Sequence, residues 1–275
     1  MNSKSKLSSL INFERELQKH LQKKFSKAPR TAQRILKKSI FYTFKGKSSH
    51  FRPRLCFATT KILGQNPKKI LPWALALEMV HTGSLIHDDM PCMDYASFRR
   101  GQLCNHLVFG EDVALLAGTA LFIESFSVLK SSLFDKNRKD FLELLISTIG
   151  FQGLMSGQVL DLKERSSSKK EILNTMHLKT GVLISACVLG PGFLWADSSQ
   201  QKALEKFSKN LGLAYQLADD YQDEKSVQRK WLFEKGMFFL KESSEALNFF
   251  GKKSKDLKIF ISEIKRRFIL KPENP

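Results

Sequence analysis

Two clusters of aspartates are the residues of this chain whose type and spacing point most directly to chemistry. The acids of the first aspartate cluster are Asp88, Asp89 and Asp94. The acids of the second aspartate cluster are Asp219, Asp220 and Asp223. Each cluster ends a stretch of largely apolar sequence, and burying carboxylates is costly unless a cation compensates for their charge. We therefore expect both clusters to bind cations.

The spacing within the clusters favours magnesium. Asp219 and Asp223 are four residues apart, so on a helix their side chains share a face that the acid next to Asp219 borders. Asp88 and Asp94 lie on different sides of a straight helix, but Pro91 disturbs a helix because it lacks a backbone donor. A local bulge there would bring both carboxylates to one ion. Oxygen ligands favour Mg²⁺, which keeps water ligands and works with substrate phosphates, so two acidic walls predict a diphosphate receptor.

Cations and polar side chains accompany the clusters. Arg99 and Arg100 follow the first cluster, and guanidinium groups bind phosphate oxygens in pairs. Lys179 and Thr180 interrupt an apolar helix, where a lone lysine needs an anion or a water-filled cavity. Other polar residues that precede the first cluster or interrupt apolar helices are Arg52, His81, Gln158, Asp161 and Gln216. They suit a tunnel for a substrate that is half diphosphate and half hydrocarbon, although a buried structural histidine is the alternative for His81.

Helical spacing dominates the elements that must position these residues, and alternating strand patterns are rare. Leu10, Phe13, Leu17 and Leu21 repeat at three and four residues. Longer helices are predicted over residues 71–89, 111–129, 141–161, 169–188 and 198–223, with a break at 190–192, and shorter helices over 240–250 and 255–268. We therefore predict an all-α bundle around a deep apolar cavity, in a single domain over residues 1–275.

The composition narrows the partners. Of the 275 residues, 42% are hydrophobic and 26% charged, which is typical of a folded chain rather than a disordered one. The net charge of +18 favours an anionic partner, but the basic residues are dispersed without a nucleic-acid-binding signature, so we expect no nucleic acid. The four cysteines have no metal-ligand spacing and fit reduced thiols in a cytoplasmic protein. The polar N-terminus and the interruption of the apolar run 181–195 by Pro191 predict neither a signal peptide nor a transmembrane segment.

The ordered motifs resemble those of trans-isoprenyl diphosphate synthases, the polyprenyl synthetase family. The matching segments are 78–94, 98–101, 105–106, 109–112, 116–118, 157–161, 179–181 and 216–223. The resemblance covers roughly residues 10–225 and is greatest to bacterial and plant-type geranylgeranyl diphosphate synthases.

The resemblance implies a homodimeric enzyme that joins isopentenyl diphosphate head to tail to dimethylallyl, geranyl or farnesyl diphosphate. It implies Mg²⁺, about three ions with substrate bound, as the group that stabilises the departing diphosphate. The implied ligands are Asp88, Asp94 and Asp219, with Asp89, Asp220 and Asp223 supporting them. The residues implied at the allylic diphosphate are Arg99, Lys179, Thr180 and Gln216. Those implied at isopentenyl diphosphate are Arg52, His81, Arg100 and Lys47, and Gln158 and Asp161 would add polar groups to the cavity.

The chain departs from the family pattern in three places. Ser49 stands where the family has a lysine that binds isopentenyl diphosphate, which leaves Lys47 or His50 to substitute. The family's Gly-Lys loop after the second cluster is replaced by residues 224–230, and the region after about residue 225 is shortened. Residues 95–97 replace acids that commonly follow the first cluster.

The residues just before the first cluster predict product length. In the family a bulky aromatic side chain at Gly83 would block the tunnel, so glycine there, beside the small Ser84, leaves space. We therefore predict geranylgeranyl diphosphate as product, with farnesyl diphosphate or a longer product as alternatives.

Two further functions fit part of the pattern. A terpene cyclase also uses aspartate clusters and magnesium, but the pairs at Arg99–Arg100 and 179–180 favour the synthase. A weakly active or non-catalytic partner subunit of a synthase is favoured by the missing lysine at Ser49 and the shortened C-terminal region, and is opposed by the retained aspartates.

Overall fold

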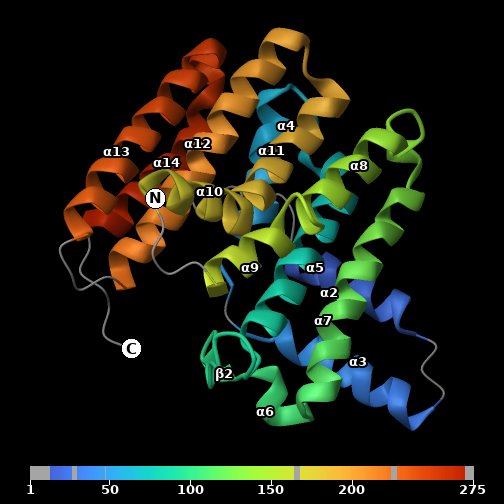
Figure 1. Cartoon of the computed structure of the whole chain (residues 1–275). Helices are drawn as coiled ribbons and strands as arrows, with labels where there is room; N and C mark the ends of the chain where they lie inside the picture. The colour runs from blue at the N-terminus through green and yellow to red at the C-terminus, as the bar shows by residue number, and fades with distance from the viewer. Residues whose placement is uncertain (1–12, 27–29, 47, 164–167, 224–227, 270–275) are drawn as a thin grey trace. The chain divides into compact units, whose positions relative to one another are not determined.

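The computed structural model describes residues 13–26, 30–46, 48–163, 168–223 and 228–269, and Leu10 lies outside them. Helices make up most of these residues, which confirms the all-α prediction (Figure 1). Within this described part the only strands form one short hairpin. The chain divides into two compact units, Met1–Arg54 with Leu71–Ser132, and Leu55–Ile70 with Leu133–Pro275. The single domain over 1–275 stays a prediction.

The first unit is built on a pair of apolar helices, α5 and α7. Its elements are α2 (Phe13–Lys24), α3 (Thr31–Thr43), the start of α4 (Phe51–Ile62), α5 (Leu71–Asp88), β1 (Phe98–Arg99), β2 (Gln102–Leu103), α6 (Asn105–Phe109), α7 (Glu111–Ser125) and a 3₁₀ helix (Phe126–Lys130). Helix α5 is apolar on most sides because it is buried on most sides, from Trp73 to Ile86. A Cβ atom added at Gly83 would lie 2.9 Å from the carbonyl oxygen of Gly118, so α5 and α7 approach closely at this point.

The hairpin of the first unit turns at two residues with positive φ. Phe98 pairs with Leu103 and Arg99 with Gln102. Arg100 (φ 56°) and Gly101 (φ 79°) occupy the two positions of the turn, and positive φ at both is what a tight hairpin with the right-handed twist of its strands requires. Glycine adopts this conformation freely, whereas Arg100 is held in it by the hairpin.

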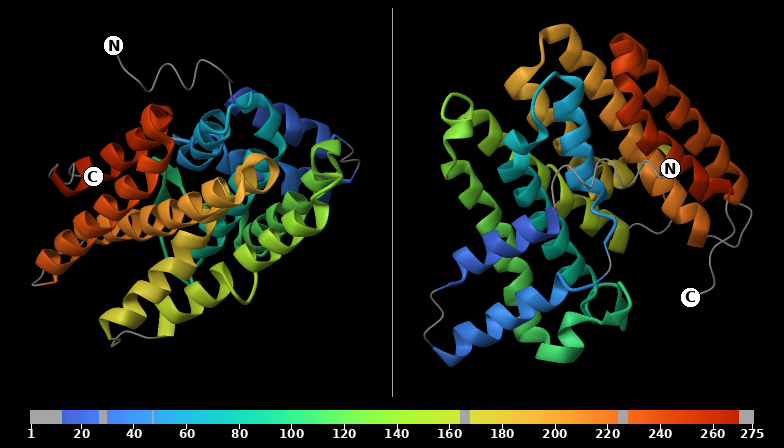
Figure 2. Two further views of the ribbon diagram at one scale, coloured as in Figure 1. Left: turned by 90° about the horizontal axis from the view of Figure 1, so that it is seen from above. Right: turned by 180° about the vertical axis from the view of Figure 1, so that it is seen from behind.

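The second unit contains three long helices, α12, α13 and α14, that lie side by side (Figures 1 and 2). Its elements are the rest of α4, a 3₁₀ helix (Pro67–Ile70), α8 (Arg138–Ile149), α9 (Leu154–Lys163), α10 (Lys169–Met176), a π-helix (His177–Gly181), α11 (Val182–Trp195), α12 (Ser198–Asp223), α13 (Arg229–Ala246), a 3₁₀ helix (Leu247–Ser254) and α14 (Lys255–Ile269); the 3₁₀ helix Ser132–Phe134 lies at the boundary of the units. Leu257, Phe260, Ile264 and Phe268 repeat at three and four residues and are buried, which explains why α14 packs as an amphipathic helix.

The predicted helices differ from the observed ones in three places. The helix predicted over 141–161 is two helices, because the chain turns sharply at 150–153, where a Cβ atom on Gly153 would overlap the carbonyl oxygen of Thr148. The predicted break at 190–192 is absent, and α11 passes through Pro191 because burial of this very apolar helix outweighs one lost hydrogen bond. The helix predicted over 240–250 begins earlier, at Arg229, and its end is a separate 3₁₀ helix.

Two segments, Glu111–Lys130 and Lys169–Trp195, are long and apolar enough to cross a membrane by length and composition. About half of each is buried inside the protein, 44% and 50% of the apolar window respectively, and core helices pass the same test. Because α11 continues through Pro191, the argument from a break in this run is wrong. The absence of a transmembrane segment stays a prediction.

Candidate substrate and metal site

The first aspartate cluster lies on a turn that ends α5. The backbone N–H of Asp94 donates to the carbonyl oxygen of Asp88 at 2.9 Å, and that of Tyr95 donates to Met90 at 3.1 Å. Tyr95 has a φ of 52°, so the chain reverses immediately after the cluster. The turn brings the backbone of Asp94 back to Asp88, as the expected bulge requires, and their joint binding of one ion stays a prediction.

Asp89, at the same helix end, pairs with the arginine of the hairpin. Arg99 donates from Nε and Nη2 to the same carboxylate oxygen of Asp89, at 2.9 and 2.6 Å. The Asp89 side chain is only 5% exposed, whereas that of Arg99 is 38% exposed. The buried acid therefore orients a guanidinium group whose outer face remains accessible, which suits an arginine that binds an anion.

A second group of basic residues in the first unit contains the cations Arg52 and Arg100 and the imidazole of His81. Burial lowers the pKa of His81 well below its usual value, and the positive charges of Arg52, Arg100 and Arg99 lower it further. Arg52 is 8% exposed, and its Nε has no hydrogen-bond partner among the residues that the structure describes. A buried guanidinium with an unpartnered donor, beside other cations and a neutral imidazole, is the kind of environment that an anion would stabilise.

Of the two residues expected to replace the missing lysine, His50 and Lys47, the structure describes only His50. His50 (φ 46°) places Nδ1 3.3 Å from a carboxylate oxygen of the buried Glu78, and its ring packs edge-on against Phe13. His50 is therefore oriented by Glu78. Lys47 lies outside the described residues.

In the second unit, the π-helix His177–Gly181 is held between two glycines of neighbouring helices. A Cβ atom on Gly157 of α9 would overlap the backbone nitrogen of Lys179, and one on Gly212 of α12 would lie 2.7 Å from the Cα atom of Gly181. The backbones of α9 and α12 thus approach the π-helix more closely than any side chain would allow. Wide turns of this kind inside helices are frequent at functional sites.

This close packing sets the register of a polar network. Lys179 donates to Asp161 on α9 at 2.5 Å. Thr180 donates to Oε1 of Gln216 on α12 at 2.6 Å, and Nε2 of Gln216 donates to Asp220 at 2.7 Å. The sequence predictions placed these five residues near one substrate, and within this unit the structure brings them together. Gln158, also predicted, lies on α9 one turn before Asp161.

Asp220 is an acid of this network whose surroundings disfavour its ionised form. Burial raises its pKa to about 6, the hydrogen bond from Gln216 lowers it, and the charges of Asp161 and Asp223 raise it again. In the part of the chain that the structure describes, no three His, Cys, Asp or Glu side chains lie close enough together to hold a metal ion by themselves. Carboxylate oxygens such as those of Asp220 and Asp223 are ligands that suit Mg²⁺, which keeps water and takes further oxygens from phosphates.

Sequence reasoning missed Arg267, which forms an ion pair with Asp219. Arg267 lies near the end of α14, in a region that matched no motif, and only the packing of α14 against α12 brings it to the second cluster. The same reasoning missed the π-helix and the role of Gly212. Glycines that interrupt otherwise helical patterns were the only signal for these close approaches.

The space that we expected beside Gly83 is filled by α7. A Cβ atom at Gly83 would meet Gly118 at 2.9 Å and the Cβ atom of Leu121 at 3.3 Å. Ser84, the next residue, is half-buried, and its hydroxyl donates to the carbonyl oxygen of His81. The part of Gly83 and Ser84 in product length stays a prediction, and a large residue at Gly83 would disturb the helix pair itself.

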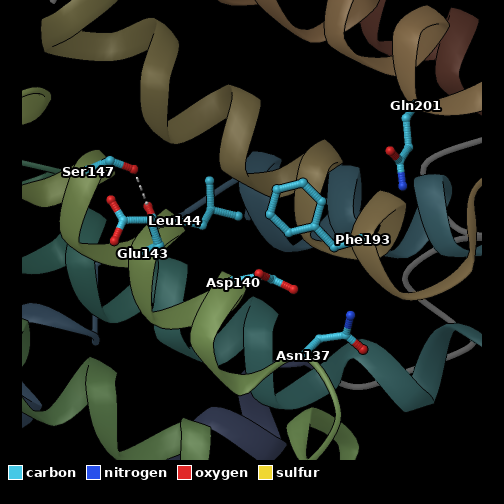
Figure 3. A pocket seen from close by; sticks show the side chains of 7 residues that line it. All are labelled: Asn137, Asp140, Glu143, Leu144, Ser147, Phe193 and Gln201. Carbon is cyan, nitrogen blue, oxygen red and sulfur yellow. Dashed lines mark hydrogen bonds between the residues drawn. The ribbon is translucent and has the colours of Figure 1, made fainter. Parts of the chain in front are cut away.

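Among the residues that the structure describes, two pockets each lie within one unit, and neither of these two is the deep apolar cavity that we predicted. A pocket of about 500 Å³ in the second unit is lined by Asn137, Asp140, Glu143, Leu144, Ser147, Phe193 and Gln201 (Figure 3). None of the described residues predicted for the site lines it. A pocket of about 20 Å³ in the first unit lies beside Asp89, Arg99 and Arg100. The apolar cavity stays a prediction.

The all-helical fold is that of an isoprenoid synthase, and the two aspartate clusters and the arginines beside them suit a diphosphate substrate. The chain belongs to the polyprenyl synthetase family, whose model matches residues 33–232. It is 37% identical over 211 residues to a geranylgeranyl diphosphate synthase of Cyanophora paradoxa, covering 74% of this chain and 70% of that protein. It is 36% identical over 203 residues to a farnesyl diphosphate synthase of Bacillus subtilis, covering 71% and 68%. A solved structure of a geranyltransferase from Legionella pneumophila superposes with a TM-score of 0.87 at 25% identity, over 98% of this chain and 99% of that chain.

These findings confirm the prediction of a short-chain trans-prenyltransferase. These two relatives are named for products of different length, geranylgeranyl diphosphate and farnesyl diphosphate.

Proposed function

We propose that this prenyltransferase condenses isopentenyl diphosphate with allylic diphosphates, up to farnesyl diphosphate, to give geranylgeranyl diphosphate. The similarity to the Cyanophora paradoxa enzyme supports this product, and the similarity to the Bacillus subtilis enzyme makes farnesyl diphosphate the alternative. The small side chain of Ser84, half-buried near the first cluster, also favours the longer product.

The observation that carries the proposal is that the buried Nε of Arg52 has no hydrogen-bond partner among the residues described in the structure. Desolvating a guanidinium without a full set of partners is costly, so the protein gains most when an anion fills this position. In the proposal this anion is the diphosphate of isopentenyl diphosphate, held by Arg52 and Arg100. His81, whose pKa is lowered by burial and by these arginines, would be neutral and donate one hydrogen bond.

The allylic diphosphate would bind with Mg²⁺ at the two aspartate clusters. The proposed ligands are Asp88, Asp94 and Asp219, supported by Asp89, Asp220 and Asp223. When bound, Mg²⁺ supplies positive charge to the diphosphate as it departs. Arg99, oriented by Asp89, would add a guanidinium to the same group.

The remaining polar residues would stabilise charge on the substrate carbon. Because Thr180 and Asp220 fix both ends of the Gln216 amide, its carbonyl oxygen keeps one orientation. We assign this dipole and the Thr180 hydroxyl to the allylic carbon, which becomes positive as its C–O bond breaks. The double bond of isopentenyl diphosphate then forms the new C–C bond, and one proton leaves that unit, for which the released diphosphate is the acceptor.

We further propose a homodimer located in the cytoplasm. The family resemblance supports the homodimer, and the free cysteines support the cytoplasmic location. Analytical ultracentrifugation and cell fractionation test these two statements independently of activity.

The test of the proposed reaction is an assay of the purified chain alone. Radiolabelled isopentenyl diphosphate is incubated with Mg²⁺ and each allylic diphosphate in turn, and the dephosphorylated products are separated by chromatography. We expect geranylgeraniol as the main product and no incorporation after chelation of Mg²⁺. Arg52→Gln should show a raised KM for isopentenyl diphosphate and retain its allylic KM.

A partner subunit is the second candidate, favoured by Ser49 in place of a lysine. In that case the purified chain would incorporate no label alone but would change the rate or product of an active synthase mixed with it. Incorporation by the isolated chain contradicts this candidate.

A further inference from the structure

Arg267 occupies a defined position at the second aspartate cluster. It forms an ion pair with Asp219, and its guanidinium lies over the ring of Tyr215, 4.8 Å from the centroid. Tyr215 and Asp219 are four residues apart on α12, so ring and carboxylate stand on one face of that helix. Both charged side chains are mainly buried, with 35% of Arg267 and 28% of Asp219 exposed.

The backbone around Arg267 is fixed from two further sides. Its neighbour Phe268 is 3% exposed and fills a notch at Gly236, where any Cβ atom would overlap the ring. The amide of Gln222 donates to the carbonyl oxygen of Arg267, which satisfies one of the carbonyl groups left open in the last turn of α14. The guanidinium is therefore positioned by packing as well as by charge.

We propose that Arg267 is an internal counter-ion of Asp219, where it competes with a metal ion for the carboxylate. When metal and diphosphate bind together, the guanidinium of Arg267 pairs with the diphosphate instead. This inference rests on the proposed function, in which Asp219 is a metal ligand. A metal ion that binds alone must separate Asp219 from Arg267 and leaves a half-buried guanidinium without its acid. A metal ion that arrives with a diphosphate replaces both partners, because the carboxylate gains the metal and Arg267 gains phosphate oxygens.

Arg267 thus couples the binding of metal to the binding of diphosphate. Removal of its charge should have opposite effects on the two halves of the exchange. Metal alone should bind more tightly, because its competitor is gone. The gain in metal affinity that a diphosphate provides should become smaller, because the guanidinium that receives the diphosphate is gone.

The experiment measures Mn²⁺ binding to the full chain by electron paramagnetic resonance, with and without saturating inorganic pyrophosphate. The variants are Arg267→Gln and Arg267→Lys, and the matched control is Arg266→Gln, which removes the same charge from an exposed neighbour on α14. We expect Arg267→Gln to bind Mn²⁺ alone about threefold more tightly than wild type, the effect of losing one partly exposed ion pair. Arg266→Gln should match wild type, Arg267→Lys should lie between, and pyrophosphate should enhance Mn²⁺ binding several-fold less in Arg267→Gln than in wild type.

Circular dichroism verifies that each variant is folded, and Arg267→Lys keeps the test decisive if the glutamine variant is not. The inference is overturned if the Arg267 variants and Arg266→Gln have equal Mn²⁺ affinities and equal enhancement by pyrophosphate. Asp219→Asn separates this result from the underlying assignment. If it leaves Mn²⁺ binding unchanged, the metal assignment of the proposed function fails, whereas binding that depends on Asp219 but not on Arg267 refutes the exchange alone.

Discussion

Replacement of Asp220 by asparagine should stabilise the metal-free protein at neutral pH. The carboxyl group of Asp220 is mostly buried beside two other acids, and its pKa is raised to about 6 from the ordinary value of 3.8, first by burial. Between pH 3.8 and about 6, therefore, Asp220 is largely protonated in the folded protein and largely ionised in the unfolded chain. The stability contributed by this group is present below about pH 4 and is lost as the pH rises through about 6.

The size of the effect follows from the same two values. The difference between about 6 and 3.8 corresponds to at most about 3 kcal/mol in the free energy of unfolding, and relaxation of the site will reduce it. Asparagine cannot ionise and can still accept the hydrogen bond from Gln216. We therefore expect Asp220→Asn to be more stable than wild type by about 1–3 kcal/mol at pH 7.5, and about equally stable at pH 4.

Urea unfolding followed by circular dichroism, with a chelator present, measures this difference. Asp223→Asn removes the same charge from an exposed position at the end of the same helix and should have a smaller effect. Equal stability of Asp220→Asn and wild type at both pH values, or a less stable variant at pH 7.5, would refute the electrostatic account of this site.

Three further predictions concern packing, product and substrate. Gly157→Ala should lower the free energy of unfolding by about 1–3 kcal/mol, because its Cβ atom overlaps the backbone of Lys179; unchanged urea unfolding would contradict the close approach. Ser84→Phe should shorten the product, since this half-buried position can accept a ring more readily than the filled position before it; an unaltered chromatogram would remove Ser84 from chain-length control. Arg52→Gln should raise the KM for isopentenyl diphosphate about tenfold, the effect of one charge-assisted contact, and an equal rise for the allylic substrate would show that the anion was wrongly assigned.

The helices that sequence periodicity predicted best are those whose burial is itself periodic or continuous. Helices α5, α12 and α14 appear within a residue or two of their predicted ranges, because apolar residues mark their buried faces throughout. The failures have tertiary causes. Pro191 was expected to break a helix, but burial of α11 overrides its local preference. Gly150 and Gly153, in contrast, fall inside one predicted helix although the chain turns there.

The candidate site was predictable where a polar residue interrupts apolar sequence. Lys179, Gln216 and the aspartates stand out because a charged or amide group in such a stretch needs a partner. Arg267 does not stand out, because it follows Arg266 in an ordinary basic turn and acquires its role only when α14 packs on α12. The π-helix has no sequence signature of its own, since it depends on two neighbouring backbones.

Those neighbouring backbones have a consequence for how the chain can evolve. Gly157 and Gly212 let two helices touch the π-helix main chain to main chain, so the positions of the polar groups do not depend on which core side chains surround them. Neighbouring apolar residues can be exchanged and repacked while the contact stays in register. These two glycines thus preserve the arrangement of the polar groups while the surrounding sequence changes. A single methyl group at either glycine would disrupt that arrangement.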